Sequence, residues 1–502
     1  MIEPTQILGG GEIQLASSEK KENPTGILEA DLNDYIEQSL GNFGIMQFLQ
    51  SLFVALSMVF DAQQAFVAAF TDARPTWHCK ATCSRKNYDI CKLPRSAWDW
   101  NGPSTMTIIS QWGLECASPF LTSLPQSVFF MGCLLAGFLV TPLADSYLGR
   151  KKMLSLSCLT MSIISSLIIF SPNLWMYCAF KFMIGFCRSS LVTCSTVLLV
   201  ERVRKEWRFT VGVIGYVMYT LGFLSLPAIA YVYRDSSWKP IYLWISIPAL
   251  CYSLIAYIFV KESPRWLLMH GKLRDSGITL TPSQLIEFSN MRASTFTWYS
   301  SFRCIFMTSW ALKRLVAVTI LAFGIGMVYF GLPLSVGNLG VNMYLSFVFY
   351  ALLEIPASIA TYVLDKCKRK PSLLAFSIVS GTSCLTCAVI GDKLHMVKLV
   401  LALVSFFCVV TSFDVFILYV VELFPTSVRN TATSMARQAM MFGAVFSPLL
   451  VSVGRKNDFF SYGIFGLIIL CTASSLLCLP ETKGIVLCDT MDEQERMGRT
   501  TV

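Results

Sequence analysis

Twelve apolar stretches, each about as long as a helix that crosses a lipid bilayer, constrain this chain more than any other feature. Hydrocarbon ~30 Å thick takes roughly 20 helical residues at a rise of ~1.5 Å per residue. The first six stretches cover residues 44–70, 124–143, 153–171, 173–200, 209–231 and 239–260. The second six cover residues 315–334, 342–364, 372–391, 396–420, 430–453 and 459–479. We therefore predict an all-α polytopic membrane protein with twelve transmembrane helices.

The composition argues against a soluble enzyme. Hydrophobic residues make up 54% of the 502 residues and charged residues only 14%, which is too little charge to cover a soluble surface. The three histidines (His78, His270 and His395) are too scattered for a metal cluster, and the chain has no Gly-x4-Gly-Lys-Ser/Thr nucleotide loop. We expect no metal, no cofactor and no catalysis. The polar residues 1–43 precede an apolar stretch that is too long for a signal peptide, so we expect no cleavage.

The positive charges are concentrated in alternate loops. Lysine and arginine clusters follow the second, fourth, sixth and eighth stretches, and the positive-inside rule therefore places both termini in the cytoplasm. The tails are then residues 1–43 and 481–502, the two halves are residues 44–260 and 315–480, and residues 261–314 form a cytoplasmic linker. Because orientation explains the net charge of +9, we expect no nucleic-acid partner.

One long loop, residues 71–123, is expected on the opposite, outer side of the membrane. It contains Cys79, Cys83, Cys91 and Cys116. An even number of cysteines on the oxidising side of a membrane predicts two disulfides, and three pairings are open.

Three loop motifs occur twice, about 220 residues apart. The pairs begin at Asp145 and Asp365, at Glu201 and Glu422, and within the motifs Glu-Ser-Pro-Arg (262–265) and Pro-Glu-Thr-Lys-Gly (480–484). We interpret the repeat as a parallel duplication with six helices in each copy. Carboxylates pair with arginines and favour helix N-termini, so we expect contacts between the halves that close the cytoplasmic side. The expected gate residues are Asp145, Gly149, Arg150, Glu201, Arg208, Asp365, Glu422 and Arg429. The alternative is that these charges only fix the topology.

The paired motifs resemble those of the major facilitator superfamily. Five further motifs are similar to the organic cation/carnitine transporters of that superfamily, most closely the plant type: Trp-His-Cys (77–79), Gln-Trp-Gly-Leu-Glu-Cys (111–116), Glu-Ser-Pro-Arg-Trp-Leu (262–267), Ala-Leu-Leu-Glu-Ile-Pro (351–356) and Glu-Leu-Phe-Pro-Thr-Ser-Val-Arg-Asn (422–430). The resemblance implies the major facilitator fold, transport by alternating access, and a small organic cation or a carnitine-like zwitterion as substrate.

The resemblance also implies a substrate site. Tyr329, Glu354 and Asp414 match cavity positions of the family, and carboxylates beside an aromatic ring suit an ammonium group. In the eleventh helix Met441 stands where the family carries a charged residue, and Arg437 lies one turn earlier on the same face. For Glu354 the alternative is an internal salt bridge or hydrogen bond that braces the second half. Arg188, Arg437 and Met441 keep a second function open, namely transport of a sugar or an organic anion.

Charged residues in the first half suggest coupling to protons. A charge in the middle of a membrane helix costs roughly 2.5–3.5 kcal/mol and needs a reason. Asp61 and Lys181 resemble the carboxylate and cation that proton-coupled sugar porters pair, and Arg188 is an alternative partner. The other reading is a permanent ion pair. We expect transport driven by a proton gradient or by the membrane potential, in a monomer embedded in the bilayer of the plasma or vacuolar membrane.

Overall fold

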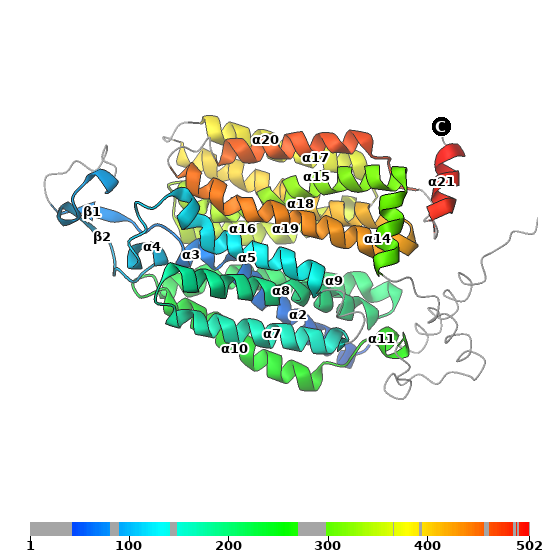
Figure 1. The fold of residues 1–502 in the computed structure, drawn as a ribbon, viewed down its shortest axis with the longest axis horizontal. Helices are drawn as coiled ribbons and strands as arrows, with labels where there is room; N and C mark the ends of the chain where they lie inside the picture. The colour runs from blue at the N-terminus through cyan, green and yellow to red at the C-terminus, as the bar shows by residue number, and fades with distance from the viewer. Residues whose placement is uncertain are drawn as a thin grey trace, which may run out of the picture.

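The computed structural model describes residues 43–80, 90–140, 148–269, 298–364, 366–390, 394–455, 461–484, 488 and 491–500. Long helices run side by side through a body that is elongated along their axes (Figure 1). Cys83, Asp145 and Asp365 lie outside the described residues, as do residues 1–42 of the expected N-terminal tail.

Six expected spans of the first half are present as helices, with η labels for short 3-10 segments. The spanning helices are α2 and α3 (Ile45–Phe66 and Ala68–Thr71), α5 (Pro119–Leu139), α7 (Arg150–Leu167), α8 (Leu174–Glu201), α9 (Arg208–Val232) and α10 (Lys239–Phe259). Local sequence explains where two of them begin. The Ser118 hydroxyl accepts from the backbone N–H of Leu121, and the Asn173 side chain accepts from that of Met176. Such N-caps satisfy backbone donors that a helix leaves free in its first turn.

The second half repeats this arrangement. Its spanning helices are α15 (Ser309–Leu334), α16 (Met343–Leu364), α17 (Arg369–Val389), α18 (His395–Leu423), α19 (Thr426–Gly454) and α20 with η8 (Tyr462–Ala473 and Ser474–Cys478). Among the described residues, eleven helices are long and apolar enough to cross a membrane, and the twelfth, Tyr462–Cys478, is shorter. Because η8 rises faster per residue than an α-helix, α20 and η8 together still reach roughly 28 Å.

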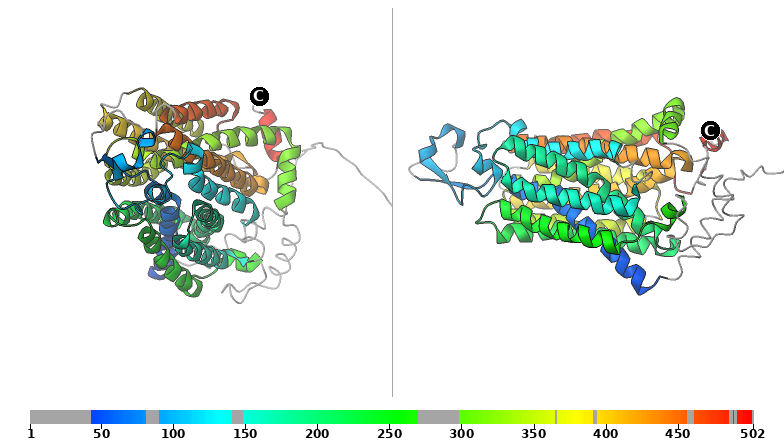
Figure 2. Two further views of the ribbon diagram at one scale, coloured as in Figure 1. Left: turned by 60° about the vertical axis from the view of Figure 1, so that its left-hand side comes forward. Right: turned by 60° about the horizontal axis from the view of Figure 1, so that its bottom comes forward.

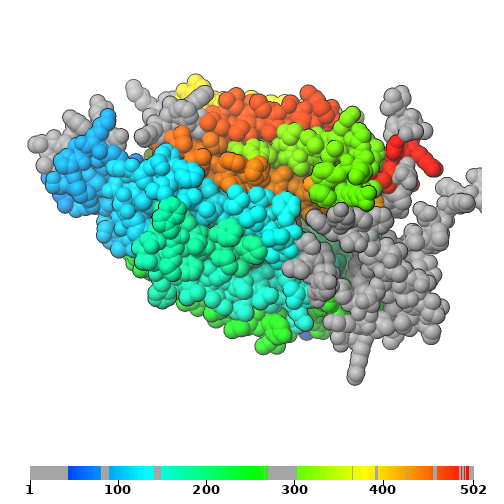
Figure 3. All heavy atoms as spheres, viewed as in Figure 1, coloured from blue at the N-terminus to red at the C-terminus, as the bar shows by residue number. Residues whose placement is uncertain are grey.

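Helix contacts confirm the duplication, because the main contacts within the first half have counterparts in the second. Helix α2 packs on α9 as α15 packs on α19, and α5 packs on α8 as α16 packs on α18. Likewise α7 contacts α8 and α10, while α17 contacts α18 and α20. The halves meet mainly through α5 against α19 and α9 against α16. The first of these seams is visible in Figure 3, where the cyan α5 lies against the orange α19.

A small segment projects from one end of the bundle, which we call the β-sheet end (Figures 1 and 3). Strands β1 (Trp77–Cys79) and β2 (Trp98–Trp100) pair antiparallel there, and the buried Trp98 and Trp100 pack with Ile90. Short segments complete it: η1 (Ile90–Lys92), η2 (Arg95–Ala97) and α4 (Ile108–Gln111).

The cysteines of this segment form disulfides, as expected. Cys91 is bonded to Cys116. Cys79 is also disulfide-bonded, whereas Cys83 lies outside the described residues.

The opposite end carries shorter elements, and we call it the α14 end. Helix α14 (Trp298–Met307) runs across the direction of the spanning helices, as Figure 2 also shows. Helices α11 (Pro264–Met269) and α21 (Met491–Thr500) lie at the same end. The remaining 3-10 segments connect helices: η4 (Ile168–Phe170), η5 (Lys205–Trp207) and η6 (Val336–Asn338).

Glycines allow the backbones of paired helices to approach closely. A Cβ atom at Gly185 of α8 would overlap the backbone of Phe129 in α5, and one at Gly132 would overlap that of Phe182. The corresponding pairs α2–α9 and α15–α19 approach in the same way: a Cβ atom at Gly222 would overlap the backbone of Val59, and one at Gly326 would overlap that of Met440. Small residues at such crossings are how helices pack in lipid, where no hydrophobic force drives them together.

We therefore expect Gly185→Ala to destabilise the bundle, because the added methyl group forces α5 and α8 apart. Overpacking of this kind costs about 1–3 kcal/mol. The matched control is Gly212→Ala on α9, where a Cβ atom meets nothing within 4 Å. Thermal unfolding of the detergent-solubilised protein measures the effect, and equal melting temperatures for the two variants would contradict the packing described above.

Candidate functional site

An ion pair joins two helices of the first half in the middle of the bundle. The Arg188 guanidinium of α8 donates to the Asp61 carboxylate of α2 at 2.6 Å, and both side chains are buried. The second carboxylate oxygen of Asp61 is buried without a hydrogen-bond partner. The described structure thus gives Asp61 its alternative partner, Arg188, and not Lys181.

Lys181 has a different environment, which corrects the expected pairing with Asp61. Its ammonium group lies 5.5–5.7 Å from the ring centroids of Phe129, Tyr177 and Tyr242. The Tyr177 hydroxyl donates to Asp72 at 2.9 Å and lies 2.8 Å from that of Tyr242. Lys181 also interacts electrostatically with Asp72. Asp72 is a buried charge that sequence analysis missed, because it stands just past the apolar stretch and was assigned to the loop.

Depth in the membrane explains both pairings. Helices α2 and α8 run antiparallel, so residues late in α2 lie level with residues early in α8. Asp61 pairs with Arg188, whereas Asp72 and Lys181 both lie about two to three turns nearer the β-sheet end. The resemblance of Lys181 to a residue of the sugar porters does not show which carboxylate lies at the same depth in the membrane.

The second half contributes two buried carboxylates from neighbouring helices. The Tyr329 hydroxyl of α15 donates to Glu354 of α16 at 3.0 Å, and Thr361 donates to Asp414 of α18 at 3.5 Å. The Tyr329 ring stacks on that of Phe413 at 5.1 Å. Within the described residues, neither carboxylate forms an ion pair. The alternative for Glu354 is therefore present as a hydrogen bond, and the part of the chain that the structure describes shows no salt bridge to it.

Two tyrosines of α9 bring these groups together across the halves. Tyr219 lies near Asp61 and Arg188 on its own side and near Glu354 and Tyr329 on the other. Tyr216 interacts with Glu354 and Asp414, yet it is 48% exposed in the middle of a spanning helix. Its exposed surface therefore belongs to a space between the halves. Sequence analysis missed both residues, because a tyrosine in an apolar helix is ordinary.

Arg437 of α19 faces the first half. It interacts electrostatically with Asp61, Arg188 and Tyr216, and it has no hydrogen bond or ion pair in the described part of the chain. Met441, one turn later, packs against the apolar core. We call Asp61, Arg188, Glu354, Asp414 and Arg437 the central charge cluster. It contains three carboxylates and two guanidinium groups.

Aromatic side chains close the space between the halves on the side of the β-sheet end. This aromatic layer consists of Phe66, Phe70, Phe223, Phe330 and Phe347. Phe223 and Phe70 each contact Phe347 of the other half, with ring centroids 4.8 and 4.9 Å apart. The Thr122 and Ser452 hydroxyls also join the halves at 2.6 Å. In this state the halves touch between the central charge cluster and the β-sheet end.

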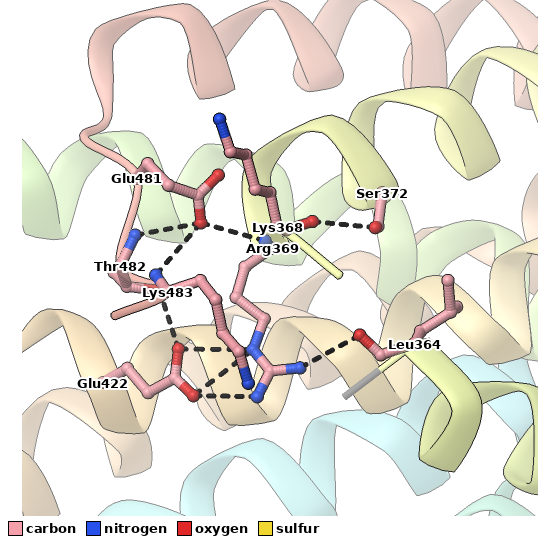
Figure 4. A network of polar contacts seen from close by, with 8 residues as sticks. All are labelled: Leu364, Lys368, Arg369, Ser372, Glu422, Glu481, Thr482 and Lys483. Carbon is pink, nitrogen blue, oxygen red and sulfur yellow. Dashed lines mark hydrogen bonds and ion pairs between the residues drawn. The ribbon is translucent and has the colours of Figure 1, made fainter. Parts of the chain in front are cut away.

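At the α14 end, one glutamate of each half caps a spanning helix. Glu262 accepts from the first backbone N–H groups of α7, those of Arg150 and Lys151, at 3.0–3.1 Å. Glu481 accepts from the backbone N–H of Arg369, where α17 begins, at 2.9 Å (Figure 4). It also accepts from the backbone N–H of Lys370 at 3.2 Å. Gly149 leaves room for this contact, since a Cβ atom there would overlap Glu262.

A second glutamate extends each cap. Glu422 pairs with Arg369 at 2.9 Å and accepts from Thr482 at 2.7 Å (Figure 4). Glu201 repeats this with Arg150, at 3.8 Å, and with Ser263. The expected gate residues did not include Glu262, Ser263, Arg369, Glu481 and Thr482, although the third repeated motif contains all of them except Arg369.

These contacts stay within one half, whereas we expected contacts between halves. Arg429 likewise donates to the Phe424 carbonyl of its own half at 3.3 Å, and Arg208 begins α9. The contacts of Asp145 and Asp365 lie outside the described residues. A contact between halves at those two positions therefore stays a prediction.

The Asp61–Arg188 pair can be tested by a double-mutant cycle. We expect Asp61→Asn and Arg188→Gln each to lower the melting temperature strongly, because removing one partner of a buried pair costs about 3–5 kcal/mol. The double variant is expected to lose less than the sum. Asp61→Asn with Lys181→Gln is the control, and its effects should add. Additive losses for Asp61 and Arg188 would contradict the pairing.

The Glu481 cap predicts a dependence on pH. Partial burial raises the pKa of this carboxyl, but four backbone N–H bonds outweigh it and hold the pKa below its usual 4.5. A lowered pKa in the folded state adds stability above pH 4.5, and this stability is lost as the pH falls through the lowered value.

We expect Glu481→Gln to lower the free energy of unfolding at pH 7 by about 1–2 kcal/mol, and thus to lower the melting temperature. The fall of the melting temperature between about pH 5 and pH 3 should become flatter. The exposed Glu206→Gln serves as control. Parallel acid profiles for the wild type and Glu481→Gln would refute the capping role.

Comparisons with known proteins agree with this architecture. The model of the Major Facilitator Superfamily matches residues 40–448. The inward-open xylose transporter XylE from E. coli superposes with a TM-score of 0.64, covering 89% of this chain and 98% of that chain at 17% identity, which shows the fold alone.

Curated relatives narrow the family. Organic cation/carnitine transporter 3 of Arabidopsis thaliana is 44% identical over 92% of this chain and 93% of its own length. Organic cation/carnitine transporter 2 of the same plant is 43% identical, with coverages of 93% and 94%. The human organic cation/carnitine transporter 2 is 28% identical over 78% of this chain and 72% of its own length. The predicted resemblance and fold are confirmed: the chain belongs to the major facilitator superfamily and, within it, to the organic cation/carnitine transporters.

Proposed function

We propose that this protein moves organic cations or carnitine-like zwitterions across a membrane by alternating access. The observation that carries the proposal is the pair of buried carboxylates, Glu354 and Asp414, which form no ion pair within the described residues. A buried carboxylate without a counter-ion is costly in a membrane protein. An ammonium group from a substrate supplies that counter-ion, and the Tyr329 ring adds a cation–π contact of ~0.5–2 kcal/mol.

The distribution of charge favours a positive group over an anion. In the first half Arg188 neutralises Asp61. Arg437 belongs to the second half, but it lies near this pair. The excess negative charge is therefore next to α15, α16 and α18. A zwitterion fits the same space, because its ammonium group meets Glu354 and Asp414 while its carboxylate meets Arg437. A sugar leaves both carboxylates unpaired, which makes the alternative function the weaker one. Met441 contributes shape to this site but no charge.

Alternating access needs contacts that form at one end when those at the other end open. The aromatic layer supplies such contacts toward the β-sheet end. At the α14 end the caps around Glu262 and Glu481 keep each half rigid, so the halves can rock as bodies. We propose Asp145 and Asp365, which lie outside the described residues, as further members of a gate at the α14 end.

The driving force depends on the charge of the substrate. A potential of 100 mV is worth ~2.3 kcal/mol for a monovalent cation, which corresponds to roughly 50-fold accumulation. A zwitterion gains nothing from the potential and needs a coupled ion. For that case we propose Asp61, with its unpartnered carboxylate oxygen, as the proton-coupling residue and Arg188 as its partner.

We place the β-sheet end outside and the α14 end in the cytoplasm, which puts both termini in the cytoplasm. The disulfide between Cys91 and Cys116 supports this orientation, because such bonds persist on the oxidising side of a membrane. The plasma membrane and the vacuolar membrane both meet that condition. We propose that the protein functions as a monomer, since each chain contains both halves of the site.

Uptake of radiolabelled tetraethylammonium, choline, carnitine and glucose into proteoliposomes tests the function. We expect uptake of at least one amine and none of glucose. Glu354→Gln and Asp414→Asn should each reduce amine uptake about tenfold or more, because each removes one charge-assisted contact. The exposed Glu206→Gln is the matched control. Glucose uptake that survives Asp414→Asn, with no uptake of any amine, would refute the proposal.

A further inference from the structure

A cavity lies at the β-sheet end, beyond the aromatic layer. Its volume is about 970 Å³, and it opens between the segments that follow α3, α9, α15 and α19. Side chains of both halves line it, among them Asp72, Gln126, Asn338 and Arg455. A cavity of this size is large enough for a small-molecule site. We call it the vestibule.

Two arginines dominate the charge of the vestibule. Arg234 and Asp235 neutralise each other at 3.2 Å. Arg74 and Arg455 lie near one another and near Asp72. In the described part of the chain neither guanidinium has a hydrogen bond or an ion pair. The vestibule therefore presents an excess of positive charge toward its interior.

Asp72 adds a fixed negative group to the same wall. It is only 8% exposed, and one of its carboxylate oxygens accepts from Thr71 and Tyr177. The other oxygen is buried without a hydrogen-bond partner. Hydrogen bonds thus hold the carboxylate in place beside Lys181, and its second oxygen keeps an unused acceptor close to the vestibule.

Aromatic side chains line the vestibule near these charges. Phe70, Trp77, Tyr233 and Tyr344 all belong to its lining. Rings of this kind bind quaternary ammonium groups by cation–π attraction. A simple cation would still meet two unpaired arginines, and a simple anion would make no use of the rings or of Asp72.

We propose that the vestibule is an outer binding site for a zwitterion that carries an ammonium group and a carboxylate a few carbons apart. Arg455 binds the carboxylate, and the rings with Asp72 receive the ammonium group. The inference rests on the proposed function and adds to it a recognition step before the central charge cluster. The aromatic layer separates the two sites, so a solute occupies them in turn.

Uptake kinetics of carnitine and choline test this assignment, because both carry a trimethylammonium group and only carnitine carries a carboxylate. We expect Arg455→Gln to raise the KM for carnitine about tenfold with the maximal rate little changed, which is the loss of one charge-assisted hydrogen bond. The KM for choline should stay the same. Arg455→Lys should recover part of the carnitine affinity. The control is Arg234→Gln, which removes the same charge from an ion-paired arginine of the same lining.

A labelling experiment tests occupancy without transport. Gly337 lines the vestibule, and a Cβ atom there meets nothing within 4 Å. Gly337→Cys should react with an impermeant methanethiosulfonate reagent added from the outside, over the background of the wild type. Carnitine should slow the reaction more than choline does, and Arg455→Gln should remove that difference.

The outcomes separate this inference from the proposed function. The zwitterion site would be overturned if other amines were taken up while carnitine was neither taken up nor able to protect Gly337→Cys from labelling. The transport function would still stand. Equal effects of Arg455→Gln on carnitine and choline would also overturn it. The absence of all amine uptake would overturn the proposed function itself.

Discussion

The cost of an unpaired charge in hydrocarbon governs how the interior of this protein is arranged. That cost brings Arg188 of α8 to Asp61 of α2 at 2.6 Å, and it surrounds Lys181 with three aromatic rings and places it near Asp72. Both arrangements tie the same two helices together. The first half is therefore internally balanced, and the unbalanced carboxylates Glu354 and Asp414 belong to the second half, which leaves them available to a substrate.

The same two halves show what sequence can and cannot predict. Helix positions followed from the apolar stretches, because lipid imposes a length and a composition on each span. The duplication followed from charged loops, which repeat at a nearly constant spacing. Pairings inside the membrane did not follow, because they depend on depth and on helix rotation. Asp61 was expected beside Lys181, but the antiparallel course of α2 and α8 places Arg188 at its level.

The repeated motifs revealed the duplication, but they did not reveal what their side chains bind. The Glu-Ser-Pro-Arg and Pro-Glu-Thr-Lys-Gly motifs marked the repeat, yet their glutamates cap α7 and α17 through backbone N–H groups. A carboxylate at a helix N-terminus meets both unsatisfied donors and the positive end of the helix dipole. A sequence motif shows which side chains recur, but it does not show a hydrogen bond from the backbone N–H of Arg369 to Glu481.

Differences between the halves determine recognition, whereas their likeness determines movement. The capped helices at the α14 end are alike in both halves, and so are the close-packed helix pairs around Gly222 and Gly326. The central charge cluster is not repeated, since among the described residues it has an ion pair on one side and carboxylates with only hydrogen bonds on the other. The vestibule is unlike both, with Arg455 and Asp72 on a wall shared by the halves. The vestibule and the central charge cluster each offer groups of both charges, so a solute with two opposite charges fits both sites in turn.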